Sequence, residues 1–500
     1  MLQLLLLLLT SSLGLAATSR PGVVLILADD LGYGDPGCFG HPSSQTPNLD
    51  WLAAEGRRFS DFYSAASVCS PSRAALLTGR YPTRSGIYPG VFYPASKGGL
   101  PLNETTIAEL LKQQGYQTAM VGKWHLGYGL NGSYLPIHQG FDKFLGIPYS
   151  HDQGPCQNLT CFPPDTKCFG ECDQGVVLLP VFKNNKIIQQ PVHFTKLTPM
   201  YDNFARHFIL KAAKKQKPFF LYYASHHTHY PQFASADFAG KSKRGPLGDA
   251  LMEFDASVGV ILNALRKAGV ENNTLVFFTS DNGPELRRQT RGGNAGLLKC
   301  GKGTTYDGGM REPAIAYWPG RITPGVTHEL ASTLDILPTV ASISGAKLPQ
   351  VKLDGYDMSD ILFNNGKSKR ETMFYYPVAR SKELGVFAVR YGKYKAHYYT
   401  EGSILSDTSP DESCHWSAPV MRHIPPLLFD LEADPSENYR LSCYELPTFA
   451  SIIEQIQNET VKFESGMEFG ESQMERGLDP ELEPCIKPGC EPRPQCCQQT

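Results

Sequence analysis

The chain has 500 residues, 41% of them hydrophobic and 19% charged, and its formal net charge at pH 7 is −2. A chain of this length and composition buries one or more large cores, which excludes an intrinsically disordered protein. The balanced charge provides no basic stripe for a phosphate backbone, so we expect no nucleic-acid partner.

The first expected element is a signal peptide over residues 1–17. Its apolar run from Leu2 to Ala16 is interrupted by polar residues at 10–12 and ends in small residues. The alternative is an uncleaved membrane anchor, which needs about 20 consecutive apolar residues. No later stretch is apolar enough to span a bilayer, so we predict entry into the secretory pathway and no transmembrane segment.

Residues 18–350 are expected to form one α/β domain. From residue 22 to about 345, short apolar runs alternate with amphipathic helical stretches, a pattern typical of a mainly parallel sheet sandwiched by helices. Predicted helices begin at Thr46-Pro47, at a capping box formed by Thr106 and Glu109, and at Leu251, and they end at Gly56, Gly115 and Gly269.

Four predicted strands of this region each end in polar side chains. The strands are Val23–Ala28, Gln117–Val121, Pro218–Ala224 and Thr274–Ser280, and the polar residues after them are Asp29, Asp30, Lys123, His125, His226, His227, His229, Asp281 and Asn282. Ligands of parallel sheets bind beyond the carboxyl ends of the strands. The sequence therefore predicts one crevice that collects acids, bases and cations from four segments.

After about residue 350 the pattern changes to that of a smaller domain over residues 351–500. Val386–Tyr399 alternates around Gly392-Lys393 like an antiparallel hairpin, and a helix is expected near Phe449–Ile456. We expect a small antiparallel sheet followed by a cysteine-rich tail.

Cysteines and glycosylation sequons agree with a secretory route. The 13 cysteines are an odd number, which leaves at least one without a partner in the chain. The disulfide candidates are Cys156, Cys161, Cys168, Cys172, Cys300, Cys414, Cys485, Cys490, Cys496 and Cys497. The first four and the last four are interpreted as locally stapled loops, with zinc sites as the alternative, and Cys38 and Cys443 have no obvious local partner. The expected glycosylation sites are Asn103, Asn131, Asn158, Asn272 and Asn458.

Cys69 is expected at the N-terminus of a short helix. The run Cys69-Ser70-Pro71-Ser72-Arg73 leads into a helical stretch with proline near its start and Gly79 after its end. The unpaired amides and the dipole of a helix N-terminus favour negative charge, which suits a nucleophilic oxygen or a bound anion. Taken alone, such a cysteine is more commonly a buried or disulfide-bonded residue.

The order C-x-P-S-R followed by T-G-R resembles the signature of the sulfatase family, in which the cysteine is oxidised to formylglycine. The resemblance runs from about residue 20 to the end of the chain. It is supported by L-A-D-D-L-G-Y-G-D from Leu27, G-K-W-H-L-G from Gly122, Y-S-H-D-Q-G-P-C from Tyr149, S-H-H-T-H-Y-P from Ser225 and S-D-N-G-P-E from Ser280. It implies an alkaline-phosphatase-like fold and the hydrolysis of sulfate monoesters.

The chemistry explains why a plain serine or cysteine would not serve as the nucleophile. A hydroxyl that takes a sulfuryl group is freed only by a second attack at a crowded sulfur, whereas a hydrated aldehyde carries two hydroxyls on one carbon. One hydroxyl attacks the sulfur, and deprotonation of the other cleaves the carbon–oxygen bond and regenerates the aldehyde. We therefore expect covalent catalysis with a built-in release step at Cys69.

Four of the polar residues offer oxygen ligands, the type that a hard divalent cation prefers over zinc. The resemblance implies that Asp29, Asp30, Asp281 and Asn282 bind one Ca²⁺, with Mg²⁺ as the alternative, together with the modified Cys69 and a sulfate oxygen. Without the resemblance, the same residues are equally typical of solvated turns after strands.

The resemblance also implies roles for three cations. Lys123 and Lys302 hold the sulfate, Lys302 neutralises the leaving oxygen, and Arg73 orients the formylglycine. By itself, each of these residues would be interpreted as a surface cation.

Two histidines and a serine complete the implied site. His125 acts as the base for sulfate release, His229 serves the leaving-group oxygen, and Ser150 contacts the sulfate or the diol. A histidine without such a motif is more often structural, which is the interpretation kept for His226 and His227. His151 and Asp152 receive no role.

The substrate and partners come from the resemblance alone. It implies a sulfated galactolipid, galactosylceramide 3-sulfate, presented by a saposin in the lysosome, with secretion as the second choice. It further implies a formylglycine-generating enzyme during maturation and a homodimer or larger homo-oligomer. The alternatives are a phosphate mono- or diester hydrolase of the same superfamily, which the ratio of sulfate to phosphate turnover would identify, and a non-catalytic glycan- or lipid-binding homologue, which would bind without turnover.

Overall fold

The computed structural model describes residues 20–154, 176–379, 381–402, 414, 418–492 and 495–497. The expected signal peptide over 1–17, the cysteine cluster Cys156, Cys161, Cys168 and Cys172, and the sequon at Asn158 lie outside the described residues. No helix in these described ranges is long and apolar enough to cross a membrane.

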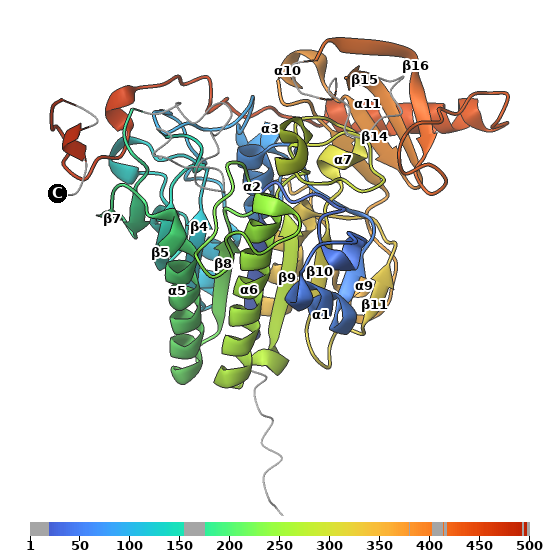
Figure 1. The fold of residues 1–500 in the computed structure, drawn as a ribbon. Coiled ribbons are helices and arrows are strands. Elements are labelled where there is room, and N and C mark those ends of the chain that lie inside the picture. Colours follow the sequence, from blue (N-terminus) through green and yellow to red (C-terminus); the bar gives the residue numbers. More distant parts are fainter. Residues whose placement is uncertain are drawn as a thin grey trace, which may run out of the picture.

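A large sheet, with ten strands within the described residues, forms the centre of the molecule (Figure 1). Its inner strands run parallel in the order β9 (Thr274–Ser280), β1 (Gly22–Ala28), β8 (Phe219–Ala224), β4 (Gln117–Lys123) and β5 (Lys143–Ile147). Every residue of β1, β8 and β9 is buried, because helices cover both faces of the sheet. The four strands predicted from the sequence lie next to one another in this parallel part.

The strands at the two edges are shorter and include antiparallel neighbours. Beyond β9 lie β10 (Ala314–Tyr317), β2 (Arg57–Phe59) and β11 (Gly325–Thr327), and beyond β5 lie β6 (Val181–Lys183) and β7 (Lys186–Gln189). β10 runs antiparallel to β9 and β2, and β6 runs antiparallel to β5 and β7. The sheet is therefore mainly parallel, as predicted, with mixed edges.

Helices pack on both faces of this sheet (Figure 1). One face is covered by α2 (Cys69–Thr78), α4 (Ile107–Gln113) and α8 (Ile336–Ser344), and the other by α1 (Pro47–Glu55), α5 (Phe194–Lys214) and α6 (Gly245–Ala268). Side chains of β1 alternate between these two cores, with Val23 and Leu25 on the α2 side and Val24 and Ile26 on the α5 side. The predicted sandwich is confirmed.

Local sequence signals set the helix ends. The Thr106 hydroxyl accepts a hydrogen bond from the Glu109 amide (3.2 Å), and the Glu109 carboxylate accepts one from the Thr106 amide (2.8 Å), which forms the predicted capping box of α4. Gly269 follows α6 with a φ of 67°, a left-handed conformation that glycine adopts without a Cβ clash. α6 begins at Gly245, earlier than the predicted Leu251, because a proline in its first turn is compatible with a helix start.

A smaller sheet lies beyond the carboxyl ends of the large-sheet strands (Figure 1). Within the described residues it has four antiparallel strands, β13 (Thr372–Tyr375), β14 (Ala388–Tyr391), β15 (Tyr394–Glu401) and β16 (Val420–Asp430), and α11 (Phe449–Ser465) packs beside them. β14 and β15 form the predicted hairpin, with Gly392 at a φ of 56° in its turn. The C-terminal antiparallel sheet is therefore confirmed.

Short elements and the tail connect the two sheets. The short elements are β3 (Phe62–Tyr63), β12 (Ala331–Ser332), α3 (Pro82–Ser85), α7 (Asp307–Met310), α9 (Ser359–Phe363) and α10 (Ser381–Leu384). After α11 the chain returns to the large-sheet region, where the Gly470 amide donates to the Thr83 carbonyl (2.9 Å) and the Gln473 amide to the Gly86 carbonyl (2.8 Å). The limits 18–350 and 351–500 remain predictions.

The described cysteines pair less often than the sequence suggested. Disulfides join Cys300 to Cys414 and Cys485 to Cys497. Cys490 and Cys496, predicted as disulfide candidates, are free thiols, as are Cys38 and Cys443. Within the described residues the tail is closed by the Cys485–Cys497 bridge, and both of these cysteines are buried beside Val177.

The sequons within the described residues lie on the surface. The asparagines with exposed side chains are Asn103, Asn131, Asn272 and Asn458. A glycan at any of them would extend into solvent, and their use remains a prediction.

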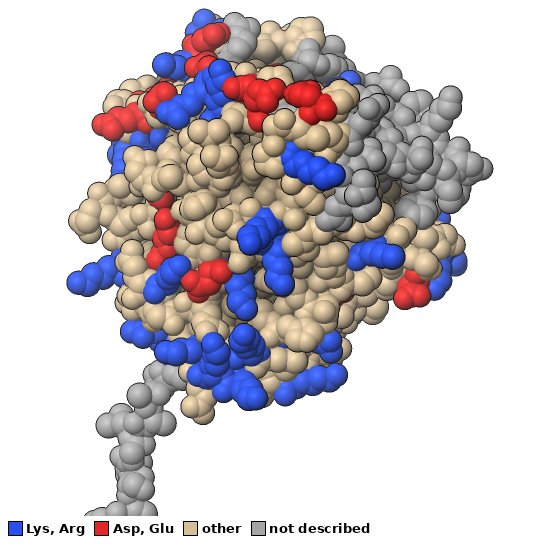
Figure 2. Space-filling model, turned by 90° about the vertical axis from the view of Figure 1, so that its left-hand side faces the viewer, with Lys and Arg blue, Asp and Glu red and all other residues tan. Residues whose placement is uncertain are grey.

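Positive charge is concentrated at one end of the molecule. Figure 2 shows lysine and arginine side chains gathered at the lower end of the visible face. Lys211, Lys214, Lys215 and Lys217 are exposed at and after the end of α5. Because α5 leads into the start of β8, these lysines lie at the opposite end of the sheet from the strands' carboxyl ends. The net charge of −2 for the whole chain does not indicate this local excess of lysines.

A buried ion cluster links the small sheet to α7. Lys395 of β15 is fully buried, and its Nζ lies 2.8 Å from Asp307 Oδ1 in α7 and 3.1 Å from Glu437 Oε1. Burial by itself would raise the pKa of Asp307, but Lys395, with Arg311 and Arg390, lowers this pKa to about 2. The carboxylate therefore stays charged, and the ion cluster joins β15 of the small sheet to α7.

Replacing Lys395 by methionine should lower the free energy of unfolding by about 3–5 kcal/mol, because Asp307 and Glu437 would stay buried without the cation nearest to both. Lys393→Met is the matched control. Lys393 Nζ lies 2.6 Å from Asp430, but its side chain is 40% exposed, and surface pairs of this kind contribute at most about 1 kcal/mol. Denaturant unfolding followed by circular dichroism measures both variants, and equal losses would contradict a structural role for the buried cluster.

Candidate active site

The polar residues that follow β1, β4, β8 and β9 meet at one edge of the large sheet. The Asp30 amide donates to Asp281 Oδ1 (3.1 Å), and the Asp29 amide donates to the His227 carbonyl (2.9 Å). Lys123 Nζ, at the end of β4, lies 2.7 Å from Asp29 Oδ2. These side chains come together because neighbouring parallel strands place their carboxyl ends on the same edge.

Cys69 is the first residue of α2 and points into this group of charges. It is 2% exposed, and its Sγ lies 3.4 Å from Lys123 Nζ, 3.8 Å from Asp29 Oδ1 and 4.0 Å from Asp30 Oδ1. Burial raises the pKa of the Cys69 thiol above its ordinary value, although Lys123 and Lys302 oppose this effect. As a thiol, Cys69 is therefore protonated and a poor nucleophile.

Arg73 lies one turn along α2 and joins two of the acids. Its side chain is fully buried, and Nε and Nη2 donate to Asp281 Oδ2 at 2.9 and 2.7 Å, while Nη2 also donates to Asp29 Oδ1 at 3.0 Å. The third nitrogen, Nη1, donates to the Lys123 carbonyl at 3.1 Å. The guanidinium thereby fixes both carboxylates and the end of β4 relative to Cys69.

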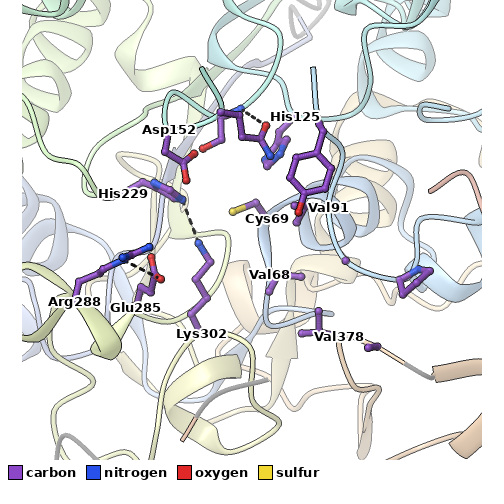
Figure 3. A pocket seen from close by; sticks show the side chains of 16 residues that line it. Val68, Cys69, Val91, His125, Asp152, His229, Glu285, Arg288, Lys302 and Val378 are labelled. Atoms are coloured by element: carbon purple, nitrogen blue, oxygen red, sulfur yellow. Dashed lines mark hydrogen bonds and ion pairs between the residues drawn. The ribbon is translucent and has the colours of Figure 1, made fainter. Parts of the chain in front are cut away.

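Lys302 and His229 form a pair (Figure 3). Lys302 Nζ lies 2.7 Å from Asp30 Oδ2 and 3.2 Å from His229 Nε2. His229 Nδ1 lies 2.5 Å from the Tyr230 carbonyl, which only accepts, so Nδ1 carries the proton and Nε2 offers its lone pair to Lys302. Burial, with the charges of Lys302 and Lys123, lowers the pKa of His229 well below its usual value. The imidazole is neutral, and Lys302 carries the positive charge.

His125 and Ser150 border the same pocket with unused polar atoms. His125 Nε2 lies 2.9 Å from the Phe92 carbonyl and therefore donates to it. Neither His125 Nδ1 nor Ser150 Oγ, both buried, has a hydrogen-bond partner within the described residues. Burial, Lys123 and Arg73 lower the pKa of His125 well below its usual value, so Nδ1 of the neutral ring is a free proton acceptor.

The acids fit a divalent cation by their chemistry and their environment. Ligand atoms of Asp29, Asp30, Cys69 and His229 lie within 4.8 Å of one another. Burial raises the pKa of Asp30 to about 6, with Lys302 lowering it and Asp281 raising it. The buried Asn282 Oδ1 has no hydrogen-bond partner in the described part of the chain, while its Nδ2 donates to Asp30 Oδ1 (2.8 Å). A hard cation would satisfy this acceptor and the crowded carboxylates.

The pocket above Cys69 has a volume of about 310 Å³ and two unlike walls. Figure 3 shows Val68, Val91 and Val378 on one side of Cys69, and His229, Lys302, Glu285 and Arg288 on the other. Glu285 Oε1 lies 3.2 Å from Arg288 Nε. When one group of a ligand is bound at Cys69, the rest of that ligand therefore lies between an apolar wall and a charged wall.

The structure adds lining residues that sequence reasoning missed: Gln153, Glu285, Arg288 and Val378. Gln153 and Glu285 lie inside stretches that carried the sulfatase resemblance, so their motifs were a signal that could have identified them. Val378 comes from beside the small sheet, and no local pattern connects it to Cys69.

His226 and His227, interpreted from the sequence as structural, are each held by hydrogen bonds to neighbouring side chains. The Ser225 hydroxyl lies 2.9 Å from His227 Nδ1, and Glu253 Oε2 lies 3.2 Å from His227 Nε2. His226 Nε2 lies 3.3 Å from the Tyr201 hydroxyl. Neither histidine lines the pocket above Cys69.

Two family models match the chain. A model described as sulfatase covers residues 21–346, and one described as the C-terminal region of aryl-sulfatase covers residues 368–498. Arylsulfatase A from Homo sapiens is 57% identical over 494 residues, which are 98% of this chain and 97% of that protein. Arylsulfatase A from Bos taurus is 58% identical over 487 residues, which are 97% of this chain and 96% of that protein.

Solved structures agree with these matches. The PsFucS1 sulfatase from Pseudoalteromonas sp. superposes with a TM-score of 0.74 and 27% identity, over 90% of this chain and 92% of that chain. The phosphonate monoester hydrolase of Agrobacterium radiobacter, at 18% identity and a TM-score of 0.58 over 89% of this chain and 96% of that chain, shares the fold. On the family models and on the identity over nearly its full length, this chain belongs to the sulfatase family and is an arylsulfatase-type sulfuric ester hydrolase.

Proposed function

We propose that Cys69 is converted to formylglycine and that its hydrate is the nucleophile for a sulfate monoester. The observation that carries this proposal is the position of Cys69, buried at the start of α2 with Lys123 Nζ at 3.4 Å and beneath a pocket of about 310 Å³. The raised pKa of the thiol argues against an unmodified cysteine as nucleophile. The hydrated aldehyde supplies one hydroxyl for attack on sulfur and a second for release.

Lys123 and Lys302 bind the sulfate oxygens, and Arg73 holds the surrounding acids. Burial would lower the pKa of Lys302, but Asp30 and its neighbours raise it well above the usual value, so this ammonium stays charged. It faces the Nε2 lone pair of His229 at 3.2 Å. The pair therefore carries the proton that the leaving oxygen takes up, and Ser150 Oγ contacts the sulfate.

His125 Nδ1 accepts the proton of the second hydroxyl in the release step. The carbon–oxygen bond to the sulfate then breaks, sulfate leaves with the bonding electrons, and the aldehyde returns. This role is supported by the unpartnered Nδ1 of a neutral, buried ring whose other nitrogen is held by Phe92.

Asp29, Asp30, Asp281 and Asn282, with the modified Cys69, are proposed to hold Ca²⁺, with Mg²⁺ as the alternative. Such a cation would lower the pKa of the diol and withdraw charge from the sulfate. Support comes from the oxygen-only donors and from the unsatisfied Asn282 Oδ1.

The substrate is proposed to be galactosylceramide 3-sulfate or a related sulfated galactolipid. The apolar wall at Val91 and Val378 can pack against a ring face, and the Glu285–Arg288 wall can bind hydroxyls beside the sulfate ester. We further propose action in the lysosome after passage through the secretory pathway, with secretion as the second choice. The proposed partners are a formylglycine-generating enzyme, a saposin-type lipid presenter and a second copy of this chain.

The modification can be measured directly. The tryptic peptide Phe59–Arg73, taken from protein made in a eukaryotic secretory pathway, should carry an aldehyde at position 69. Mass spectrometry with hydrazide capture detects it. Fully processed protein with an alkylatable cysteine at this position would overturn the proposed nucleophile.

Cys69→Ser should fold but lose multiple turnover by at least about 10³-fold, because one hydroxyl cannot expel sulfate and each enzyme would stop as a sulfated serine. Mass spectrometry of the same peptide after incubation with an aryl sulfate measures the trapped group. Cys443→Ser is the matched control, since Cys443 is an exposed free thiol outside the pocket and its loss should leave turnover unchanged. Sustained turnover by Cys69→Ser would refute the release mechanism.

Removal of divalent cations should abolish most aryl sulfate hydrolysis while leaving the circular dichroism spectrum unchanged, and added Ca²⁺ should raise the melting temperature of the chelated protein. Asn282→Ala should weaken this Ca²⁺-dependent increase. Asp255→Asn provides the comparison, because Asp255 is a buried carboxylate that accepts bonds from Asn48 and Leu49 away from the site. A chelator-insensitive enzyme with a Ca²⁺-independent melting temperature would contradict the metal site.

A further inference from the structure

Gln153 lies at the edge of the active-site pocket and makes contacts that the proposed mechanism does not use. It is 4% exposed, and its Nε2 donates to the Phe92 carbonyl at 2.8 Å. Its Oε1 accepts from the Ser150 amide at 3.2 Å. Because a carbonyl only accepts and an amide N–H only donates, one orientation of the Gln153 side chain satisfies both partners.

The Phe92 carbonyl is shared by two donors. Gln153 Nε2 lies 2.8 Å away and His125 Nε2 lies 2.9 Å away, so both lone pairs of this oxygen are engaged. The Phe92 amide donates to Ser70 Oγ at 3.1 Å, next to Cys69 in α2. The backbone of one buried residue, Phe92, therefore connects the nucleophile's helix, the His125 loop and the Ser150 loop.

This shared carbonyl decides which nitrogen of His125 carries the hydrogen. Its Nε2 must carry the hydrogen that Phe92 accepts, which leaves the lone pair on Nδ1. The charged side chains acting on His125 are Lys123, Arg73 and Lys302, all cations that favour the neutral ring. Gln153 is a neutral donor, so its hydrogen bond to the Phe92 carbonyl adds no charge near His125.

We propose that Gln153 is a positioning residue for sulfate release: it fixes the Phe92 carbonyl and through it the tautomer and orientation of His125. The inference rests on the proposed role of His125. The two hydrogen bonds of the Gln153 side chain go to Phe92 and Ser150 rather than to Cys69, so its loss should lower kcat much more than it changes KM.

The test compares three variants by steady-state hydrolysis of an aryl sulfate between pH 4 and pH 7, normalised to folded enzyme. Gln153→Met removes both hydrogen bonds and should lower kcat by about 10- to 100-fold at every pH, with KM changed less than about threefold. Gln153→Glu should keep near-normal kcat at the acidic end, because a protonated carboxyl can donate to Phe92 and accept from Ser150. Its kcat should then fall as the pH rises, because the ionised carboxylate repels the carbonyl.

Gln139→Glu is the matched control. Gln139 is fully buried and its Nε2 donates to the Leu100 carbonyl at 2.8 Å, but it does not line the pocket. This substitution should destabilise the fold as the pH rises without changing kcat per folded enzyme.

A double variant provides a second test. In a His125→Ala background, Gln153→Met should cause no further loss of kcat, because Gln153 acts through His125.

Three results would overturn the inference. They are a Gln153→Glu profile parallel to that of the wild type, equal kcat losses in the Gln139 and Gln153 variants, or additive losses with His125→Ala. Failure of the proposed function itself would give a different result, because the wild-type enzyme would then lack sulfate-ester turnover or formylglycine.

Discussion

A set of buried ions that neutralise one another holds the active site together. The carboxylates are Asp29, Asp30 and Asp281, and the cations are Arg73, Lys123 and Lys302. A single buried ion without a partner costs several kcal/mol, so each of these residues is tolerated because the others are in place. They come from the ends of β1, β4 and β9, from α2 and from the turn before α7, and the large sheet must align these segments before the ions can pair. The resulting charges are rigid and need no rearrangement during reaction.

Backbone carbonyls give the two active-site histidines opposite orientations. The Tyr230 carbonyl accepts from Nδ1 of His229, so Nε2 faces Lys302, whereas the Phe92 carbonyl accepts from Nε2 of His125, so Nδ1 remains free. Burial and the nearby cations keep both rings neutral. A different ring nitrogen therefore carries the lone pair in each histidine, which suits the two different roles proposed for them.

The small sheet contributes to the site as well as to stability. Val378, which follows β13, forms part of the apolar wall of the pocket. The Lys395 cluster and the Cys300–Cys414 disulfide tie this part of the chain to the segment that carries Lys302. The apolar wall and Lys302 are therefore positioned relative to each other by contacts between residues that lie far apart in the sequence.

The sequence by itself determined the strands, the helix ends and the group of chemically active residues. Uninterrupted apolar runs predicted buried parallel strands, Thr106 and Glu109 predicted a capping box, and the C-x-P-S-R motif placed Cys69 at a helix start. These signals are local, because they depend on hydrogen bonds and burial within a few residues. The tertiary structure alone decided that Cys490 and Cys496 stay free, that Gln153 and His125 share the Phe92 carbonyl, and that Val378 reaches the pocket. Each of these depends on the distance between segments brought together by packing, which no local pattern of side chains encodes.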